Sequence, residues 1–187
     1  MKEEIVAEAI KVLKNSGTIL YPTDTIWGIG CDALDEVAVR NIYTIKYRDI
    51  TKSMLILVDS IEMLANYVEE VPAMALKLID ASTRPLTIIY PKPKKIAKNL
   101  IAADNTIGIR VTRDEFCKSL IKEFGRPIVS TSANLSGQNP PLGYFDVSNE
   151  IKMAVDYIVP LRLDELSKAR SSDVVRVLKN GEIEIIR

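Results

Sequence analysis

The chain alternates between short strand-like runs and amphipathic stretches, and this alternation limits its fold more than any other feature. Short runs typical of strands occupy 18–21, 54–58, 86–90, 107–111 and 127–131. Apolar residues at helical spacing occupy 3–15, 35–46, 61–67, 73–80, 114–124 and 147–154. Because strands and helices that alternate at short spacing pack as one layered unit, the pattern predicts a single α/β domain over residues 1–187.

The end of the chain predicts a small antiparallel element. A short apolar run at 157–159 indicates one more strand, and SDVVRVLKNGEIEIIR at 172–187 indicates a β-hairpin. Asn180–Gly181 fits a two-residue turn between the two strands of this hairpin. Residues 21–30 are rich in Pro, Thr, Asp and Gly, which is typical of a turn.

The chain contains no histidine, which excludes several kinds of chemistry. Without imidazole there is no Ser-His-Asp or Cys-His nucleophile, no His-ligated zinc, and no base with an ordinary pKa near neutrality. Cys31 and Cys117 lack CxxC spacing, which favours a reducing compartment. The sequence contains neither a signal peptide nor a long apolar run, so we expect a cytoplasmic protein with no membrane partner.

The net charge of zero conceals two basic segments. Residues 40–52 hold four basic residues against one acidic residue, and residues 92–126 hold nine against four. If both segments face one cleft, the chain has a positive pocket that attracts a small polyanion. The alternative is a pair of solvated basic faces.

Four segments carry residues suited to ligand binding. In YPTDTIWGIG, hydroxyl groups follow a strand end, where open α/β sheets bind ligands. IKYRDITKS clusters three cations that suit phosphate oxygens, although solvated charges are an alternative. Arg110, inside an apolar strand, requires a carboxylate from the protein or from a ligand. STSANLSGQ supplies hydroxyls and backbone N–H groups after a strand, while GxxxxGK[ST] and GxGxxG are both absent.

Taken in this order, YPTDT-x-W-G, IKYR-x-x-x-KS, RPLT, TIGIRV and STSANLSG resemble the YrdC-like threonylcarbamoyl-adenylate synthase family. The resemblance runs from about residue 5 to the C-terminus. It implies a twisted mixed sheet flanked by helices, with a large basic concave cavity. It also implies a nucleotidyltransferase that makes threonylcarbamoyl-AMP and pyrophosphate from L-threonine, bicarbonate or CO2, and ATP.

The resemblance also assigns residues. The catalytic side chains it implies are Lys46, Arg48, Lys52 and Arg110. The ATP-binding residues it implies are Arg48, Lys52, Thr106, Ser132, Asn134, Leu142 and Lys179. The threonine-binding residues it implies are Thr25, Arg110, Ser132 and Ser172. Mg2+ would be held largely by the phosphates, and the resemblance names no protein ligands for it.

Some positions depart from the family pattern. Tyr47 replaces a small residue, Leu57 stands where longer members have a histidine, and Lys179 stands where an arginine is common. The implied partners are a downstream threonylcarbamoyl-transferase and tRNA, whose adenosine at position 37 receives the group. The rival hypothesis is a double-stranded RNA-binding or ribosome-maturation module without ATP turnover, which would bind RNA with a steep salt dependence.

Overall fold

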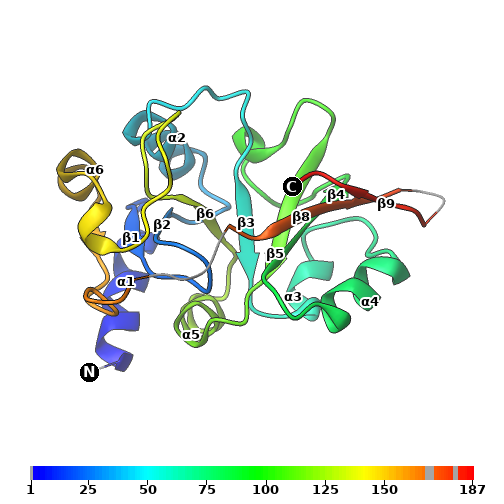
Figure 1. Ribbon diagram of the computed structural model, residues 1–187, viewed down its shortest axis with the longest axis horizontal. Coiled ribbons are helices and arrows are strands. Elements are labelled where there is room, and N and C mark those ends of the chain that lie inside the picture. The colour runs from blue at the N-terminus through cyan, green and yellow to red at the C-terminus, as the bar shows by residue number, and fades with distance from the viewer. Residues whose placement is uncertain (1, 167–170, 179–180) are drawn as a thin grey trace.

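The computed structural model describes residues 2–166, 171–178 and 181–187, which form a mixed β-sheet with helices on both faces (Figure 1). The helices are α1 (Lys2–Lys14), α2 (Glu36–Ile45), α3 (Ile61–Ala65), α4 (Ala73–Ala81), η1 (Lys98–Leu100), α5 (Glu115–Phe124), η2 (Tyr144–Asp146) and α6 (Asn149–Ala154). The strands are β1 (Ile19–Tyr21), β2 (Gly28–Gly30), β3 (Leu55–Val58), β4 (Leu86–Pro91), β5 (Thr106–Val111), β6 (Ile128–Ser132), β7 (Tyr157–Ile158), β8 (Asp173–Val177) and β9 (Ile183–Ile185).

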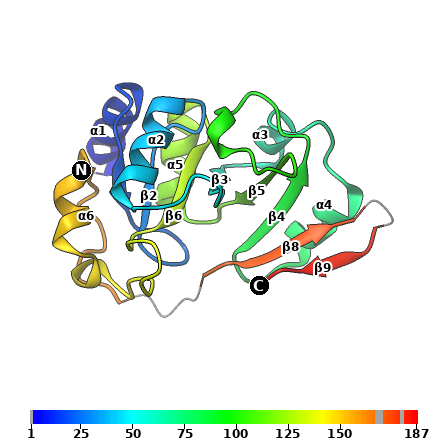
Figure 2. The same ribbon diagram turned by 90° about the horizontal axis from the view of Figure 1, so that it is seen from above.

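The strands lie in the order β7-β1-β2-β6-β3-β5-β4-β8-β9. β1 pairs parallel to β7, β3 to β5, and β4 to β8, while the other neighbours are antiparallel. The order places β3, β5 and β6 in the centre, although helices separate them in the sequence. The predicted α/β fold with a mixed sheet is confirmed, and β8 and β9 form one end of the molecule (Figure 2).

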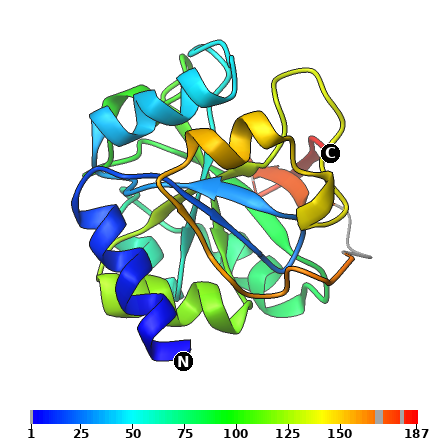
Figure 3. The same cartoon turned by 90° about the vertical axis from the view of Figure 1, so that its left-hand side faces the viewer.

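Local capping explains where the main helices begin and end. The Asp35 side chain accepts hydrogen bonds from two backbone N–H groups at the start of α2. Asp114 does the same for α5 by accepting from the Cys117 N–H at 2.9 Å. At its other end, α5 stops at Gly125, whose φ of +74° is left-handed. The α5 helix defined by Asp114 and Gly125 packs against α1 through buried apolar side chains on one side of the sheet (Figure 3).

The core has two parts, one on each face of the sheet. Along β3, Ile56 and Val58 join the cluster that includes α2, whereas Leu57 joins the cluster formed with α1 and α5. The same alternation separates Val129 from Ile128 on β6. The sheet is therefore buried on both faces, which explains why its central strands read as continuous apolar runs.

The α1 and α5 helices cover only part of their face of the sheet. Beyond Leu57, that face continues across β5, β4 and β8, where the register aligns polar and small residues. The aligned pairs on this face are Gly28 with Ser132, Leu55 with Ser130, Leu57 with Arg110, Gly108 with Ile89, and Thr87 with Val174. The face of the sheet that α1 and α5 cover is therefore apolar beneath these helices and polar where they do not cover it.

Strand β2 was not expected in the turn-rich segment 21–30. It forms because glycine allows a close approach of backbone and side chains at this point. A Cβ on Gly30 would lie 2.5 Å from the Val129 carbonyl oxygen and 2.7 Å from Cε1 of Tyr21. The residues before Gly28 form a loop, but β2 begins at Gly28. The prediction of a turn over the whole segment is therefore wrong.

The terminal hairpin is confirmed, but its turn is longer than predicted. The Leu178 N–H donates to the Glu182 carbonyl at 2.8 Å, which leaves three residues between this pair instead of two. Gly181 has a φ of +85°, as expected for a longer turn that closes on a left-handed residue. Asn180 lies outside the described residues. In the described part of the chain, no helix is long and apolar enough to cross a membrane.

Candidate functional site

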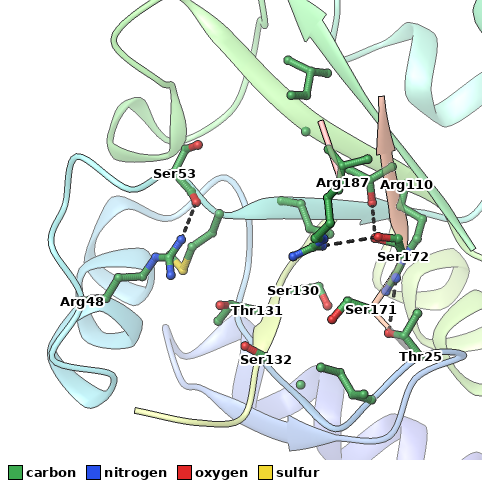
Figure 4. A pocket seen from close by; sticks show the side chains of 18 of the residues that line it. Thr25, Arg48, Ser53, Arg110, Ser130, Thr131, Ser132, Ser171, Ser172 and Arg187 are labelled. Atoms are coloured by element: carbon green, nitrogen blue, oxygen red, sulfur yellow. Dashed lines mark hydrogen bonds between the residues drawn. The ribbon is translucent and has the colours of Figure 1, made fainter. Parts of the chain in front are cut away.

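A pocket of about 290 Å³ lies on the polar part of the face that α1 and α5 leave open (Figure 4). Its walls come from β5, β4, β6, β3 and β8, together with the loops that precede β2 and β3. The polar and charged residues that line it are Thr25, Arg48, Ser53, Thr87, Thr106, Arg110, Ser130, Thr131, Ser132, Ser171, Ser172 and Arg187. Hydroxyl groups and arginines therefore dominate its polar lining.

Arg110 lies at one end of the pocket, with a side chain only 3% exposed. Its NH2 atom is 3.5 Å from Oδ1 of Asp24, and its NH1 donates to Thr25 Oγ1 at 3.3 Å. Its Nε has no hydrogen-bond partner among the described residues. A buried guanidinium with one long ion pair and an unused N–H is well suited to receive a ligand carboxylate.

Thr25 is placed beside Arg110 by the loop between β1 and β2. Its backbone N–H donates to Thr23 Oγ1 at 3.0 Å, and the two hydroxyl oxygens are 2.9 Å apart. Thr23 Oγ1 also donates to the Ile26 carbonyl at 2.8 Å. The loop therefore fixes the hydroxyl of Thr25 in a buried position at the pocket wall.

Ser172 closes the same end of the pocket from the segment before β8. Its hydroxyl is 2.8 Å from that of Thr87 on β4, and its carbonyl accepts from NH2 of Arg187 at 3.4 Å. Arg187 was missed by the sequence reasoning, because a residue that follows the edge strand β9 carries no local signal of a site. Thr87 could have been found as the one aliphatic hydroxyl in the apolar run 86–90.

Arg48 lies at the opposite end of the pocket (Figure 4). Its Nε donates to the Lys52 carbonyl and its NH2 to the Ser53 carbonyl, each at 2.9 Å. These contacts orient the guanidinium plane and use two of its five N–H groups. Arg48 is half-buried, and its guanidinium lines this end of the pocket.

Lys46 does not line the pocket. Its side chain is 1% exposed, and its ammonium donates to the carbonyl oxygens of Ser132 and Asn134. The Ser136 N–H in turn donates to the Lys46 carbonyl at 2.8 Å. Burial, with a smaller contribution from Arg48, lowers the pKa of Lys46 to about 8. Lys46 therefore holds the loop after β6 in place.

The lowered pKa of Lys46 predicts a pH dependence of stability. Unfolding returns this pKa to about 10.4, so between about pH 8 and 10 the unfolded chain binds more protons. The free energy of unfolding of the wild type should therefore rise with pH across this window relative to Lys46→Met, by on the order of 3 kcal/mol. Urea denaturation of both proteins at several pH values measures this difference, and a constant difference would contradict the assignment.

The structure brings together six of the residues that the sequence implicated: Thr25, Arg48, Thr106, Arg110, Ser132 and Ser172. The side chains of Lys46, Lys52, Asn134 and Leu142 are not in the pocket wall. Lys52 contributes its backbone carbonyl to the placement of Arg48, and Asn134 donates to backbone carbonyls of its own loop. Leu142 is exposed. Lys179 lies outside the described residues.

The pocket wall contains no Asp or Glu among the described residues, and no group of three metal-ligating side chains occurs in that part of the chain. Hard cations such as Mg2+ prefer carboxylate oxygens, with further oxygen ligands from phosphates and water. The described residues thus offer no cluster of three such ligands to Mg2+.

Comparison with known proteins relates this chain to a family. Residues 11–187 match the family model Sua5_yciO_yrdC, described as telomere recombination. The threonylcarbamoyl-AMP synthase of Pseudoalteromonas translucida is 36% identical over 184 residues, which cover 97% of each chain. The threonylcarbamoyl-AMP synthase of Hahella chejuensis is 35% identical, over 90% of this chain and 92% of that protein.

A solved structure agrees with the sequence comparisons. The structure of P. abyssi Sua5 complexed with L-threonine superposes with a TM-score of 0.86 at 26% identity. The match covers 100% of this chain and 54% of the Sua5 chain, so the present chain spans about half of that protein. The family match and the relatives above 30% identity lead to one conclusion: the chain belongs to the Sua5/YciO/YrdC family.

Proposed function

We propose that this chain is a threonylcarbamoyl-AMP synthase, which joins L-threonine, bicarbonate or CO2, and ATP and releases pyrophosphate. The observation that carries the proposal is one pocket that has the buried guanidinium of Arg110, with its unused Nε, at one end and the guanidinium of Arg48 at the other. The relatives that bear this enzyme name, and the Sua5 structure complexed with L-threonine, support the same assignment.

We assign the amino acid to the Arg110 end of the pocket. Arg110 would pair with the α-carboxylate through its unused Nε and a terminal N–H, a charge-assisted contact in a site shielded from water. Thr25 lies beside the guanidinium, and the hydroxyl of Ser172 lies on the same wall. The Thr25, Arg110 and Ser172 side chains make this end polar, which suits an amino acid.

We assign ATP to the opposite end. Arg48 would contact phosphate oxygens with its remaining N–H groups, while Thr106 and Ser132 offer hydroxyls along the wall. Arg187 adds a third guanidinium to the lining. Three arginines around one pocket can neutralise part of the charge that a triphosphate and a carboxylate bring together.

The reaction needs little acid or base chemistry from the protein. The neutral amine of threonine forms an N–C bond to CO2 and loses one proton to solvent, which gives a carbamate, and the carboxylate oxygen of this carbamate attacks the α-phosphorus of ATP. A new O–P bond forms, the bond to the β-phosphate oxygen breaks, and pyrophosphate leaves with its electrons. Because the carbamate is already ionised, no histidine is required. The protein contributes alignment of the reactants and stabilisation of negative charge.

The remaining components of the reaction are also proposals. Mg2+ would enter with the phosphates of ATP, since the described pocket offers no carboxylates to hold it. The product is a mixed anhydride of AMP, so a transferase must carry its threonylcarbamoyl group to an acceptor, which we propose is adenosine 37 of tRNA in the cytoplasm. An RNA-binding module without ATP turnover is not favoured, because the related proteins are named as enzymes.

Pyrophosphate release tests the proposed function directly. The purified chain should release pyrophosphate from ATP only when L-threonine and bicarbonate are both present. Omitting either one should reduce release to background, and threonylcarbamoyl-AMP should appear by mass spectrometry in the complete mixture. Pyrophosphate release that is independent of threonine, or no release with all three substrates, would refute the assignment.

A further inference from the structure

We infer that Thr23, a residue outside the pocket wall, fixes the Thr25 hydroxyl as a hydrogen-bond acceptor toward the amino group of the substrate. The inference rests on the proposed function, because it takes the Arg110 end of the pocket as the amino-acid site. It adds a positioning residue to that site and defines which kind of group Thr25 recognises.

The hydroxyl of Thr23 makes three contacts within its own loop. The Ile26 carbonyl oxygen lies 2.8 Å away, the Thr25 backbone nitrogen 3.0 Å, and the Thr25 hydroxyl oxygen 2.9 Å. Thr23 and Thr25 are both buried, at 9% and 5% exposure. The network is therefore shielded from solvent, so its hydrogen bonds are expected to keep a fixed direction.

The chemistry of the three groups determines where the hydrogens lie. A hydroxyl has one hydrogen and two acceptor lone pairs. The Ile26 carbonyl can only accept, so it takes the hydrogen of Thr23. The Thr25 N–H can only donate, and it occupies one lone pair of Thr23. At the third contact Thr23 has no hydrogen left, so the hydroxyl of Thr25 must donate to it.

This direction determines what Thr25 offers to the pocket. With its hydrogen directed to Thr23, the Thr25 hydroxyl oxygen acts as an acceptor toward every other partner, as it does for Arg110 NH1 at 3.3 Å (Figure 4). A ligand oxygen without a hydrogen would meet these lone pairs unfavourably, whereas an N–H group would be bound. The α-amino group of an amino acid whose carboxylate is held by Arg110 is such a donor.

The contact can persist during the reaction. Carbamate formation joins the amine nitrogen to the carbon of CO2 and releases one proton, and the nitrogen still carries one N–H. Thr25 can accept from that N–H in both the amine and the carbamate. The acceptor role therefore orients the nitrogen substituents and directs the new carboxylate away from the Thr25 wall.

The surroundings of Thr23 are built to hold it. NH1 of Arg162 lies 3.5 Å from the Thr23 carbonyl, while NH2 of Arg162 pairs with Asp114 at 2.8 Å. Asp114 is itself fixed as the cap of α5. The loop that carries the two threonines is thereby anchored to a core helix and not only to its own strands.

A double-mutant cycle tests the inference. Isothermal titration of L-threonine is carried out with the wild type, Thr23→Val, Thr25→Val and the double variant. Loss of one hydrogen bond to a charged group corresponds to an increase in Kd of about tenfold, so Thr25→Val should weaken binding by about that factor. Thr23→Val should also weaken threonine binding, and the double variant should bind threonine no more weakly than Thr25→Val alone.

Control variants separate this role from a structural one. Thr23→Ser keeps the hydroxyl and should bind threonine like the wild type, and titration with ATP should give the same Kd for every variant. If Thr23→Val does not fold, Thr23→Ala provides the same measurement without a methyl group in place of the hydroxyl. Wild-type threonine affinity in Thr23→Val or Thr23→Ala would overturn the inference.

Two further outcomes have distinct meanings. Thr23→Val could also weaken threonine binding when Thr25 is already valine. That result would show that Thr23 acts on the loop as a whole, and it would also overturn the inference. If the wild type itself does not bind threonine, the proposed function fails and the inference fails with it. If the wild type binds threonine and Thr25→Val weakens it but Thr23→Val does not, only the inference fails.

Discussion

Replacing Arg110 with alanine is expected to raise the KM for L-threonine by about 100-fold or more while the KM for ATP stays nearly unchanged. Removal of one partner from a buried charge pair costs about 3–5 kcal/mol, and about 1.4 kcal/mol corresponds to a factor of ten. The guanidinium of Arg110 is buried and has an unused Nε, so the α-carboxylate would lose its main partner. Pyrophosphate release at varied threonine and varied ATP measures both constants.

Two variants show whether the effect depends on the guanidinium of Arg110, and the melting temperature shows whether the protein still folds. Arg110→Lys keeps the positive charge but lacks the planar guanidinium that can donate two hydrogen bonds to one carboxylate, so it should retain only part of the threonine affinity. Arg113→Ala removes an exposed arginine three positions along the chain, outside the pocket, and should leave both KM values unchanged. Because Asp24 loses its ion-pair partner in Arg110→Ala, the melting temperature should be measured as well. An unchanged KM for threonine in a folded Arg110→Ala protein would rule out the carboxylate-binding role.

Replacing Arg48 with alanine should have the opposite selectivity. The KM for ATP is expected to rise by about tenfold to 100-fold, because hydrogen bonds to charged groups contribute about 1.5–3 kcal/mol each. The Kd for threonine, measured without ATP, should stay the same, since Arg48 and Arg110 lie at opposite ends of the pocket. Steady-state kinetics and titration with threonine together give the result.

Arg40 provides a matched control for Arg48. It is an exposed arginine on α2, outside the pocket wall, and Arg40→Ala should show normal kinetics for both substrates. Arg48→Lys should lie between the wild type and Arg48→Ala, because lysine cannot reproduce the two carbonyl contacts that orient the guanidinium. Normal ATP kinetics in Arg48→Ala would contradict a phosphate-binding role at this end of the pocket.

The sequence pattern predicted the architecture well where periodicity was strong. The helix around 114–124 and the strand 107–111 are both present, because capping, apolar spacing and burial agree in these segments. Strand β2 was missed, since Gly28 and Gly30 are turn residues by composition and form a strand only because β1 and β6 flank them. Strand pairing over more than 100 residues of sequence leaves no local signal.

The site was predicted in part, and the difference has a physical cause. Arg110 was expected to meet a carboxylate, and the structure gives it Asp24 at 3.5 Å together with an unused Nε. Lys46 was expected to bind phosphate with Arg48, yet its ammonium is buried against loop carbonyls. A cluster of cations in sequence does not reveal which charge faces a ligand and which one supports a loop.

Arg187 illustrates the other kind of failure. Its position in the pocket depends on β8 pairing with β4 and β9 pairing with β8, which returns the end of the chain to the site. The β8–β9 hairpin is local and was predicted from residues 172–187, but the pairing of β8 with β4 leaves no signal near residue 187. Residues on an edge strand can therefore contribute to a site that is built mainly from strands far away in the sequence.

The shared register of the central strands makes this site intolerant of small insertions and deletions. In β5, Thr106, Gly108 and Arg110 face the pocket while Ile107 and Ile109 face the core. A single residue added or lost in this strand would exchange the two sets, because side chains alternate between the faces. The pocket would become apolar and the guanidinium would enter the core, so only length changes in the loops are expected to preserve the site.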